Sequence, residues 1–339
     1  MRAFLLFTAL ALLSFAGLAQ WRRIKTQRTC PDIFRTHKAG ETPALRYASN
    51  FSLNRRDTSV RTLLIFIHGL HRNAMGYFDD AMEAVRSAGQ KKTTLVIAPQ
   101  YATEDDMGAL GGGDLLYWHK AQWKDGYASI LTSSRSHQVS MSSYELMDSL
   151  IAGILGSGYF PNIRRVVVAG HSAGGQFVDR YSVTTPIPDI WTSVSFRYIV
   201  MNPSSYLYPD ARRPARDGSF VIPDSADCPE YNHYPKGLTG LNAYAEAAGA
   251  DHILRNMLQR DIFILLGGED TEIDDPDLDV SCAGNMQGAF RLARGISFIS
   301  YISAFPGYVD KKNFAVVRGV GHSGTLIESD EAIRWIFGQ

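Results

Sequence analysis

Short apolar runs alternate with amphipathic stretches along most of the chain. The runs rich in Val, Ile and Leu end near Gly69, Gln100, Ser172, Pro203, Asp270 and Gly324. Such near-continuous runs are typical of strands buried on both faces of a parallel sheet. The stretches between them predict helices at about residues 74–88, 141–157, 174–183, 283–304 and 326–337. This alternation predicts an α/β fold with a mostly parallel, doubly wound sheet.

Two stretches interrupt the alternation. Residues 102–137 are rich in Gly, Trp and Tyr, and residues 204–250 carry many Pro, Tyr and Asp. Long irregular insertions in a compact domain are usually functional loops or lids. We therefore expect one domain from residue 20 to residue 339, with both insertions over one face. The segment from Leu45 to Leu53 alternates apolar and polar residues and predicts an outer antiparallel strand.

The first nineteen residues have the layout of a secretory signal peptide. Arg2 precedes an apolar run from Ala3 to about Leu13, and small residues allow cleavage after Ala16 or Ala19. The alternative is an uncleaved membrane anchor, although the run is short for a span of roughly 20 residues. We expect a secreted or periplasmic protein with no stable membrane insertion after cleavage.

Charge and cysteine content narrow the class further. The 339 residues are 45% hydrophobic, and 34 basic residues balance 34 acidic ones, which gives no electrostatic case for nucleic-acid binding. Export permits a disulfide, but the three cysteines leave one over. Their positions favour pairing Cys228 with Cys282 rather than with Cys30, and three unpaired thiols are the alternative. Without a CxxC pair, a cysteine-based metal site is not expected.

The stretch "GHSAGG" is the first candidate for chemistry. It matches G-x-S-x-G with Gly170, Ser172 and Gly174, between an apolar strand and the start of a helix. A nucleophile on such a sharp turn needs small neighbours, and the turn lifts its hydroxyl clear of the sheet. The following amide, Ala173 N–H, would lie at the positive end of a helix. The alternative is a Gly-rich helix cap with an ordinary serine.

A serine nucleophile needs a base, and the base needs a carboxylate. His322 follows the last predicted strand, at the sheet edge where the sites of open α/β sheets gather; an ordinary loop histidine is the alternative. His171 precedes the serine, and we expect it to point away and pack. Glu269 and Asp270 follow another strand end, and we choose Asp270 as the acid because Glu269 is expected to face solvent or cap the turn.

An acyl-transfer site also needs donors for the developing oxyanion. The loop "FIHGLHRN" follows the first strong strand, so the backbone N–H of Leu70 is the expected partner of Ala173 N–H. His68 is expected to shape this loop rather than to transfer protons. Asn73 is a possible further donor.

The motifs "HGL", "GHSAGG", "LLGGEDT" and "GVGHSG", in this order from about residue 45 to the end, resemble the α/β-hydrolase superfamily. The stretches "NPSSYLYPD", "YNHYPKGL" and "CAGNMQGAFRLARG" look like a poorly characterised group of secreted hydrolases. In that pattern Cys228 and Cys282 recur, which supports their pairing. The resemblance implies ester or amide hydrolysis without metal or cofactor: attack by Ser172, an acyl-enzyme, and water activated by His322. A serine nucleophile excludes dehalogenases, epoxide hydrolases and cysteine hydrolases, but not cofactor-free haloperoxidases.

The substrate pocket is less well defined by the sequence. Candidate lining residues are His71, Tyr117, Trp118 and Trp123, with further aromatics at Tyr127, Tyr206, Tyr208, Tyr231 and Tyr234. Local packing is the alternative for each aromatic. Arg291 and Arg294 share one face of a predicted helix and could hold a substrate carboxylate; we prefer ion pairs with the acidic run at residues 272–279.

Taken together, these features lead to three hypotheses. The leading one is a secreted serine hydrolase that cleaves a small-molecule or polymeric carboxylic ester. A peptidase or amidase on the same fold, and a non-catalytic exported binding protein, are the alternatives.

Overall fold

The computed structural model describes residues 29–110, 113–131, 138–309 and 313–338. The expected signal peptide therefore lies outside the described residues. Within these ranges, no helix is long and apolar enough to cross a membrane.

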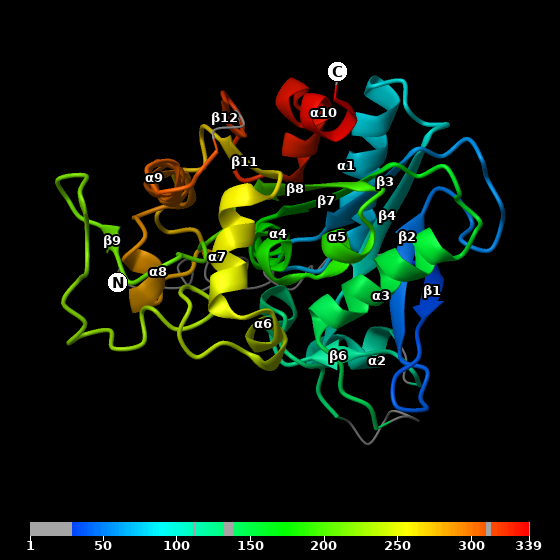
Figure 1. Cartoon of the computed structure of the whole chain (residues 1–339), viewed down its shortest axis with the longest axis horizontal. Coiled ribbons are helices and arrows are strands. Elements are labelled where there is room, and N and C mark those ends of the chain that lie inside the picture. Colours follow the sequence, from blue (N-terminus) through cyan, green and yellow to red (C-terminus); the bar gives the residue numbers. More distant parts are fainter. Residues whose placement is uncertain (1–28, 111–112, 132–137, 310–312, 339) are drawn as a thin grey trace, which may run out of the picture.

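An eight-stranded sheet forms the centre of the molecule, in the order β1-β2-β4-β3-β7-β8-β11-β12 (Figure 1). Its strands are β1 (Asp32–Arg35), β2 (Ala44–Ser49), β3 (Thr62–Ile67), β4 (Thr94–Gln100), β7 (Arg165–His171), β8 (Ser195–Met201), β11 (Ile262–Gly267) and β12 (Phe314–Val317). In this sheet, β4, β3, β7, β8, β11 and β12 pair in parallel with their neighbours in this series, whereas β2 is antiparallel to both β1 and β4. The predicted mostly parallel sheet and its outer antiparallel strand are confirmed.

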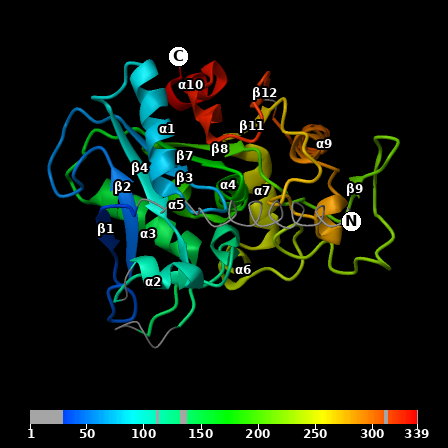
Figure 2. The ribbon, with the colours of Figure 1, turned by 180° about the vertical axis from the view of Figure 1, so that it is seen from behind.

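Helices cover both faces of this sheet because its central strands are apolar on both sides. Successive side chains of a strand point to opposite faces. Leu63 and Ile65 of β3 accordingly join one buried cluster with α3 (Ser143–Gly156), α4 (Ala173–Thr184) and α7 (Ala250–Gln259). Leu64 and Phe66 join the other cluster, with α1 (Ala74–Ser87) and α10 (Asp330–Phe337). Figure 2 shows the same two layers from behind.

The remaining elements lie mostly in the two insertions and around them. The first insertion contains β5 (Ala102–Thr103), η2 (Glu104–Asp106), α2 (Met107–Leu110), β6 (Tyr117–Trp118) and η3 (Gln122–Asp125). The second contains β9 (Arg213–Pro214), β10 (Phe220–Val221) and α6 (Ala243–Ala248), and its β9–β10 arm projects at one end of the molecule (Figure 1). The short α5 (Ile187–Ile190) follows α4.

Two predicted helices are divided in the structure. The stretch at 283–304 forms α8 (Cys282–Asn285) and α9 (Arg291–Ser303), separated by a loop in which Gly288 has a φ of 146°. Only glycine adopts such a conformation readily, so one continuous helix cannot form there. The stretch at 326–337 begins as the 3₁₀ turn η4 (Gly324–Glu328) and continues as α10.

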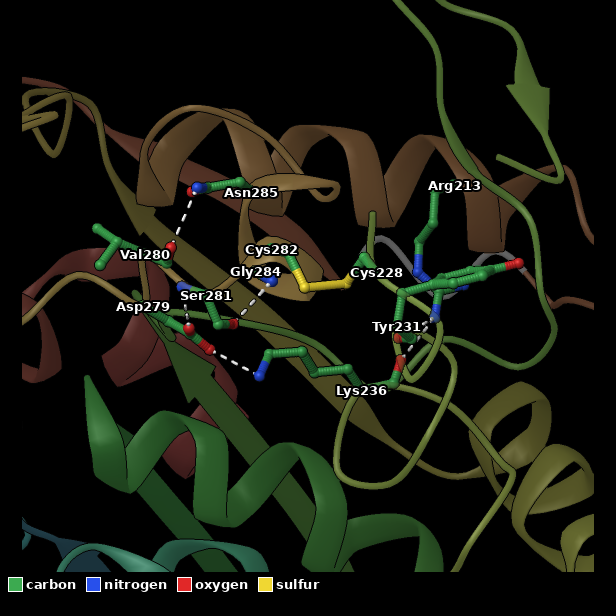
Figure 3. The surroundings of a disulfide bond; sticks show 10 residues. All are labelled: Arg213, Cys228, Tyr231, Lys236, Asp279, Val280, Ser281, Cys282, Gly284 and Asn285. Carbon is green, nitrogen blue, oxygen red and sulfur yellow. Dashed lines mark hydrogen bonds and ion pairs between the residues drawn. A yellow bond between two sulfur atoms is a disulfide. The ribbon is translucent and has the colours of Figure 1, made fainter. Parts of the chain in front are cut away.

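A disulfide joins Cys228 of the second insertion to Cys282 at the start of α8, as predicted (Figure 3). Beside it, the Lys236 ammonium lies 2.9 Å from a carboxylate oxygen of Asp279. Cys30 is buried elsewhere, where its backbone N–H donates to the Gln100 side chain. The insertion is therefore tied covalently to the segment that follows β11.

Candidate active site

Ser172 lies in the sharp turn between β7 and α4. Its φ of 58° and ψ of −119° are strained for a residue with a side chain. The backbone N–H of Ser172 donates to the carbonyl of Met201 at the end of β8, 2.9 Å away, which holds the turn against the neighbouring strand. The Ser172 residue is 7% exposed. Its place at the carboxyl edge of the sheet is the one that the strand–turn–helix pattern predicted.

Glycines allow this turn because backbone atoms press against them. A Cβ on Gly170 would lie 2.2 Å from the carbonyl oxygen of Gly174. A Cβ on Gly174 would lie 2.2 Å from the carbonyl oxygen of Ile67, and one on Gly175 would lie 2.5 Å from that of Met201. Real Cβ contacts do not become so short, so the small residues around the serine are a steric requirement.

His322 and Asp270 come together on two other loops at the same edge. The His322 Nδ1–H donates to Asp270 Oδ2 at 2.7 Å, which leaves Nε2 as the acceptor nitrogen of the neutral ring. Asp270 follows β11 and is only 2% exposed, whereas Glu269 is exposed, as expected. The His322 ring lies against His171, the residue directly before Ser172, with 4.4 Å between ring centroids.

Asn202 connects the loops that carry these residues, a role that sequence reasoning missed. It follows β8 with a φ of 43°. Its Oδ1 accepts from Gly267 N–H at 2.8 Å, and its Nδ2 donates to the Gly321 carbonyl at 3.3 Å. One side chain thus joins the end of β11 to the residue before His322. An asparagine directly before a proline at a strand end was the available signal.

The loop after β3 lies beside the serine. A Cβ on Gly69 would come within 3.6 Å of Ser172 Cβ, so the backbone at Gly69 lies beside the serine. Leu70 and Ala173, the two expected oxyanion donors, are the residues directly after Gly69 and Ser172. Arg72 shapes this loop with a φ of 57° and two bonds to Asp106, at 2.6 and 3.2 Å.

Asn73 does not have the role considered for it. Its side chain accepts from Gly76 N–H at 3.2 Å and caps α1, so it is a helix cap rather than a further oxyanion donor.

His68 is a structural residue of this loop, as expected. Its Nδ1 bonds the Gly69 carbonyl at 2.9 Å, and its Nε2 accepts from Tyr101 N–H at 3.0 Å. These partners require the neutral ring with its proton on Nδ1. Complete burial lowers the pKa of His68 to about 4. The ring links the end of β3 to the residue after β4.

His171 packs as predicted, but its partner was not foreseen. Its Nδ1 lies 3.0 Å from the hydroxyl of Tyr77, a residue of α1. Burial above all, and then the charges of His322 and Arg291, lower the pKa of His171 well below its usual range. His171 is therefore neutral beside His322.

The aromatic residues proposed for the pocket are mostly core residues. Trp118 and Trp123 are fully buried, Tyr117 is 1% exposed, and Trp123 stacks on Tyr101 with 5.6 Å between ring centroids. The same holds for the aromatics of the second insertion, Tyr206, Tyr208, Tyr231 and Tyr234, which are all buried. Their placement supports local packing and corrects the pocket assignment, while Tyr127 is partly buried against the same core.

His71 differs from these aromatics because it is a surface residue. Its side chain is 80% exposed, and its Nε2 lies 2.8 Å from Asp277 Oδ2. The pair joins the loop after β3 to the loop after β11, so His71 remains a candidate for the rim of the site.

Arg291 and Arg294 both point inward. Arg291 donates from Nη1 to Asp275 Oδ2 at 2.8 Å and lies 3.6 Å from Asp270 Oδ1, which agrees with the preferred ion pairing. Arg294 instead donates to backbone carbonyls, including those of Ser204 at 2.6 Å and Asp279 at 2.9 Å. Both are fully buried, which speaks against binding a substrate carboxylate.

Other places in the described part of the chain offer less chemistry. A cavity of about 730 Å³ between α9 and β12 is lined by residues such as Ile296, Tyr308 and Phe314, without a histidine or carboxylate. Among the described residues, no group of three or more His, Cys, Asp or Glu could hold a metal ion.

Comparisons with known proteins identify the fold. No family model matches the sequence, and a comparison with curated proteins found no match. Among solved structures, the chain is similar to the poly(3-hydroxybutyrate) depolymerase LpqC from Bordetella parapertussis, with a TM-score of 0.59 and 22% identity over 91% of this chain and 90% of that one. It is equally similar to poly(aspartic acid) hydrolase-1 from Sphingomonas sp. KT-1, with a TM-score of 0.59 and 21% identity over 91% and 98%. The chain has the α/β-hydrolase fold.

Proposed function

We propose that this protein is a serine hydrolase that cleaves carboxylic esters through an acyl-enzyme, with Ser172, Asp270 and His322 as its catalytic triad. The observation that carries the proposal is the 2.7 Å bond between His322 Nδ1 and Asp270 Oδ2, on loops beside the strained serine turn. A carboxylate on Nδ1 keeps Nε2 free to accept a proton, as a general base requires.

The proposed reaction uses these residues in the following roles. Ser172 Oγ attacks the ester carbonyl carbon while His322 Nε2 takes the hydroxyl proton, and Asp270 stabilises the imidazolium. The backbone N–H groups of Leu70 and Ala173 donate to the oxyanion. Collapse of the intermediate expels the alcohol, which receives the proton from His322. Water then repeats the sequence on the acyl-enzyme and releases the acid.

The substrate class and the location extend this proposal. One similar structure is named for a polyester, which supports a polymeric ester as substrate alongside a small-molecule ester. The other is named for poly(aspartic acid), a polyamide, which keeps amide hydrolysis as the alternative. The Cys228–Cys282 disulfide suits an oxidising compartment, which agrees with the signal peptide expected at residues 1–19 and with a secreted or periplasmic enzyme.

Replacement of the serine tests the mechanism. Ser172→Ala should lower turnover of p-nitrophenyl esters by about 10⁶-fold and abolish labelling by a fluorophosphonate, with an unchanged circular dichroism spectrum. Ser87→Ala, at an exposed serine that ends α1, is the matched control and should behave as wild type. Normal labelling of Ser172→Ala would contradict the proposal.

The same assays separate the alternatives. Cleavage of a peptide library without ester turnover would favour a peptidase. A native protein that no active-site probe labels would favour a binding protein.

A further inference from the structure

Arg291 places a buried positive charge directly behind the proposed catalytic acid. It is the first residue of α9, and it is fully buried. Its Nη1 lies 2.8 Å from Asp275 Oδ2 and 3.6 Å from Asp270 Oδ1. In the same turn, Leu292 N–H donates to the Asp270 carbonyl at 3.1 Å. The start of α9 thus holds both the backbone and the charge of Asp270.

The two oxygens of the Asp270 carboxylate face different partners. Oδ2 accepts from His322, and Oδ1 faces Arg291. The carboxylates of Asp270 and Asp275 and the guanidinium of Arg291 together carry a net charge of minus one behind the His322 imidazole. Water screens this arrangement little, because the Asp270 and Arg291 side chains are 1% and 0% exposed.

Two other titratable groups lie near His322. His171 is neutral, since burial lowers its pKa well below the usual range, and it bonds the Tyr77 hydroxyl. Asp80 of α1 lies against Gly324, beyond the histidine, where burial and then Glu328 raise its pKa to about 6. The charge beside the buried Asp270 carboxylate is that of Arg291, whose own closer partner is Asp275.

We infer that Arg291 is a positioning residue and Asp275 its anchor: together they orient Asp270 towards His322, and the Arg291 charge offsets one of the two carboxylate charges behind the imidazole. The inference rests on the proposed function. Arg291 acts through Asp270 and, being buried, does not touch the substrate. A second uncompensated carboxylate would favour the imidazolium, which cannot accept the serine proton.

Charge-changing variants of the full chain test this inference. Arg291→Met leaves two negative charges, so the acidic limb of the kcat/KM profile should move to higher pH by about one unit. Asp275→Asn leaves no net charge, because the charges of Asp270 and Arg291 cancel, so the acidic limb of the profile should move to lower pH. Arg291→Lys keeps the charge and should restore most of the wild-type profile. KM should stay within about twofold in all three variants, because neither residue reaches the substrate.

A readout that needs no turnover separates this inference from the proposed function. The titration of the His322 ring is followed by NMR in a Ser172→Ala background, with His322→Asn used for assignment. Opposite shifts for Arg291→Met and Asp275→Asn support the inference even if ester turnover is absent, in which case the proposed function fails alone. Superimposed titrations of wild type, Arg291→Met and Asp275→Asn would overturn the inference. If Arg291→Met does not fold, Asp275→Asn decides by the direction of its shift.

Discussion

The serine turn (residues 170–175) and the acid loop (residues 268–281) are built by opposite means. Backbone packing fixes the serine turn, since a side chain at Gly174 would collide with the carbonyl of Ile67. Charges and a covalent bond fix the acid loop, through the pairs Arg291–Asp275 and Lys236–Asp279 and through the disulfide. Steric and electrostatic constraints respond to different perturbations, so the two halves of the site should fail under different conditions.

The largest effect is expected in the serine turn. The Cβ of Gly174→Ala would lie 2.2 Å from a backbone oxygen that cannot move freely. Fluorophosphonate labelling should slow by about 10³-fold, and the free energy of unfolding should fall by about 3 kcal/mol. Gly108→Ala, where a Cβ meets open space, is the matched control and should label normally. A fully active Gly174→Ala would show that the turn is not sterically constrained.

The covalent tie of the acid loop should matter next. Replacing both Cys228 and Cys282 by Ser should lower the free energy of unfolding by about 3 kcal/mol, because the unfolded chain gains freedom. Thermal unfolding with and without reductant measures this effect: reductant should destabilise wild type and leave the double variant unchanged. Equal sensitivity of both proteins to reductant would contradict the assignment.

Mild acid should destabilise the protein through His68, which holds the loop beside the serine turn. The pKa of His68 is about 4 in the folded protein, below its value in the unfolded chain. The unfolded chain therefore binds a proton first, and stability falls by about 3 kcal/mol as the pH drops from about 6.5 to about 4. Urea unfolding should show a shallower slope in this window for His68→Gln, with a residual slope from His171. If wild type and His68→Gln showed the same pH dependence of stability, His68 would not be a source of the acid destabilisation.

Strong acid should produce a smaller effect in the acid loop. Burial alone would raise the pKa of Asp279, but the Lys236 charge and the bonds from Ser281 outweigh it and lower the pKa to about 2. The stabilisation is present above about pH 4 and is lost as the pH falls towards 2, about 2 kcal/mol in total. Asp279→Asn should lose this dependence in urea unfolding. Asp274→Asn, at an exposed carboxylate of the same loop, should retain it.

Local sequence patterns were sufficient to predict those parts of the structure that one contiguous segment defines. The turn around Ser172 could be predicted because the strand, the small residues and the helix start lie within a few positions. The Cys228–Cys282 pair was supported only by resemblance and by position. The six parallel strands followed from apolar runs, whereas the break between α8 and α9 depended on the backbone at Gly288.

Contacts between distant segments could not be predicted in this way. Helical spacing suggested an acidic partner for Arg291, but not that Asp270 itself lies beside it, since 21 positions separate them along the printed sequence. Trp118 and Trp123 occur in a Gly-rich stretch, where a core residue and a pocket residue have the same sequence pattern. Only the packing around Tyr101 distinguishes the two cases.

The Cys228–Cys282 bridge closes a covalent ring that contains β11 and the whole acid loop. A protease that cut the chain once between these cysteines would therefore release no fragment, and the nicked molecule would keep Asp270 attached to both of its halves. Without reductant, nicked and intact protein would have nearly the same mass and migrate together. An enzyme that works among extracellular proteases would gain tolerance to such cuts from this one bond.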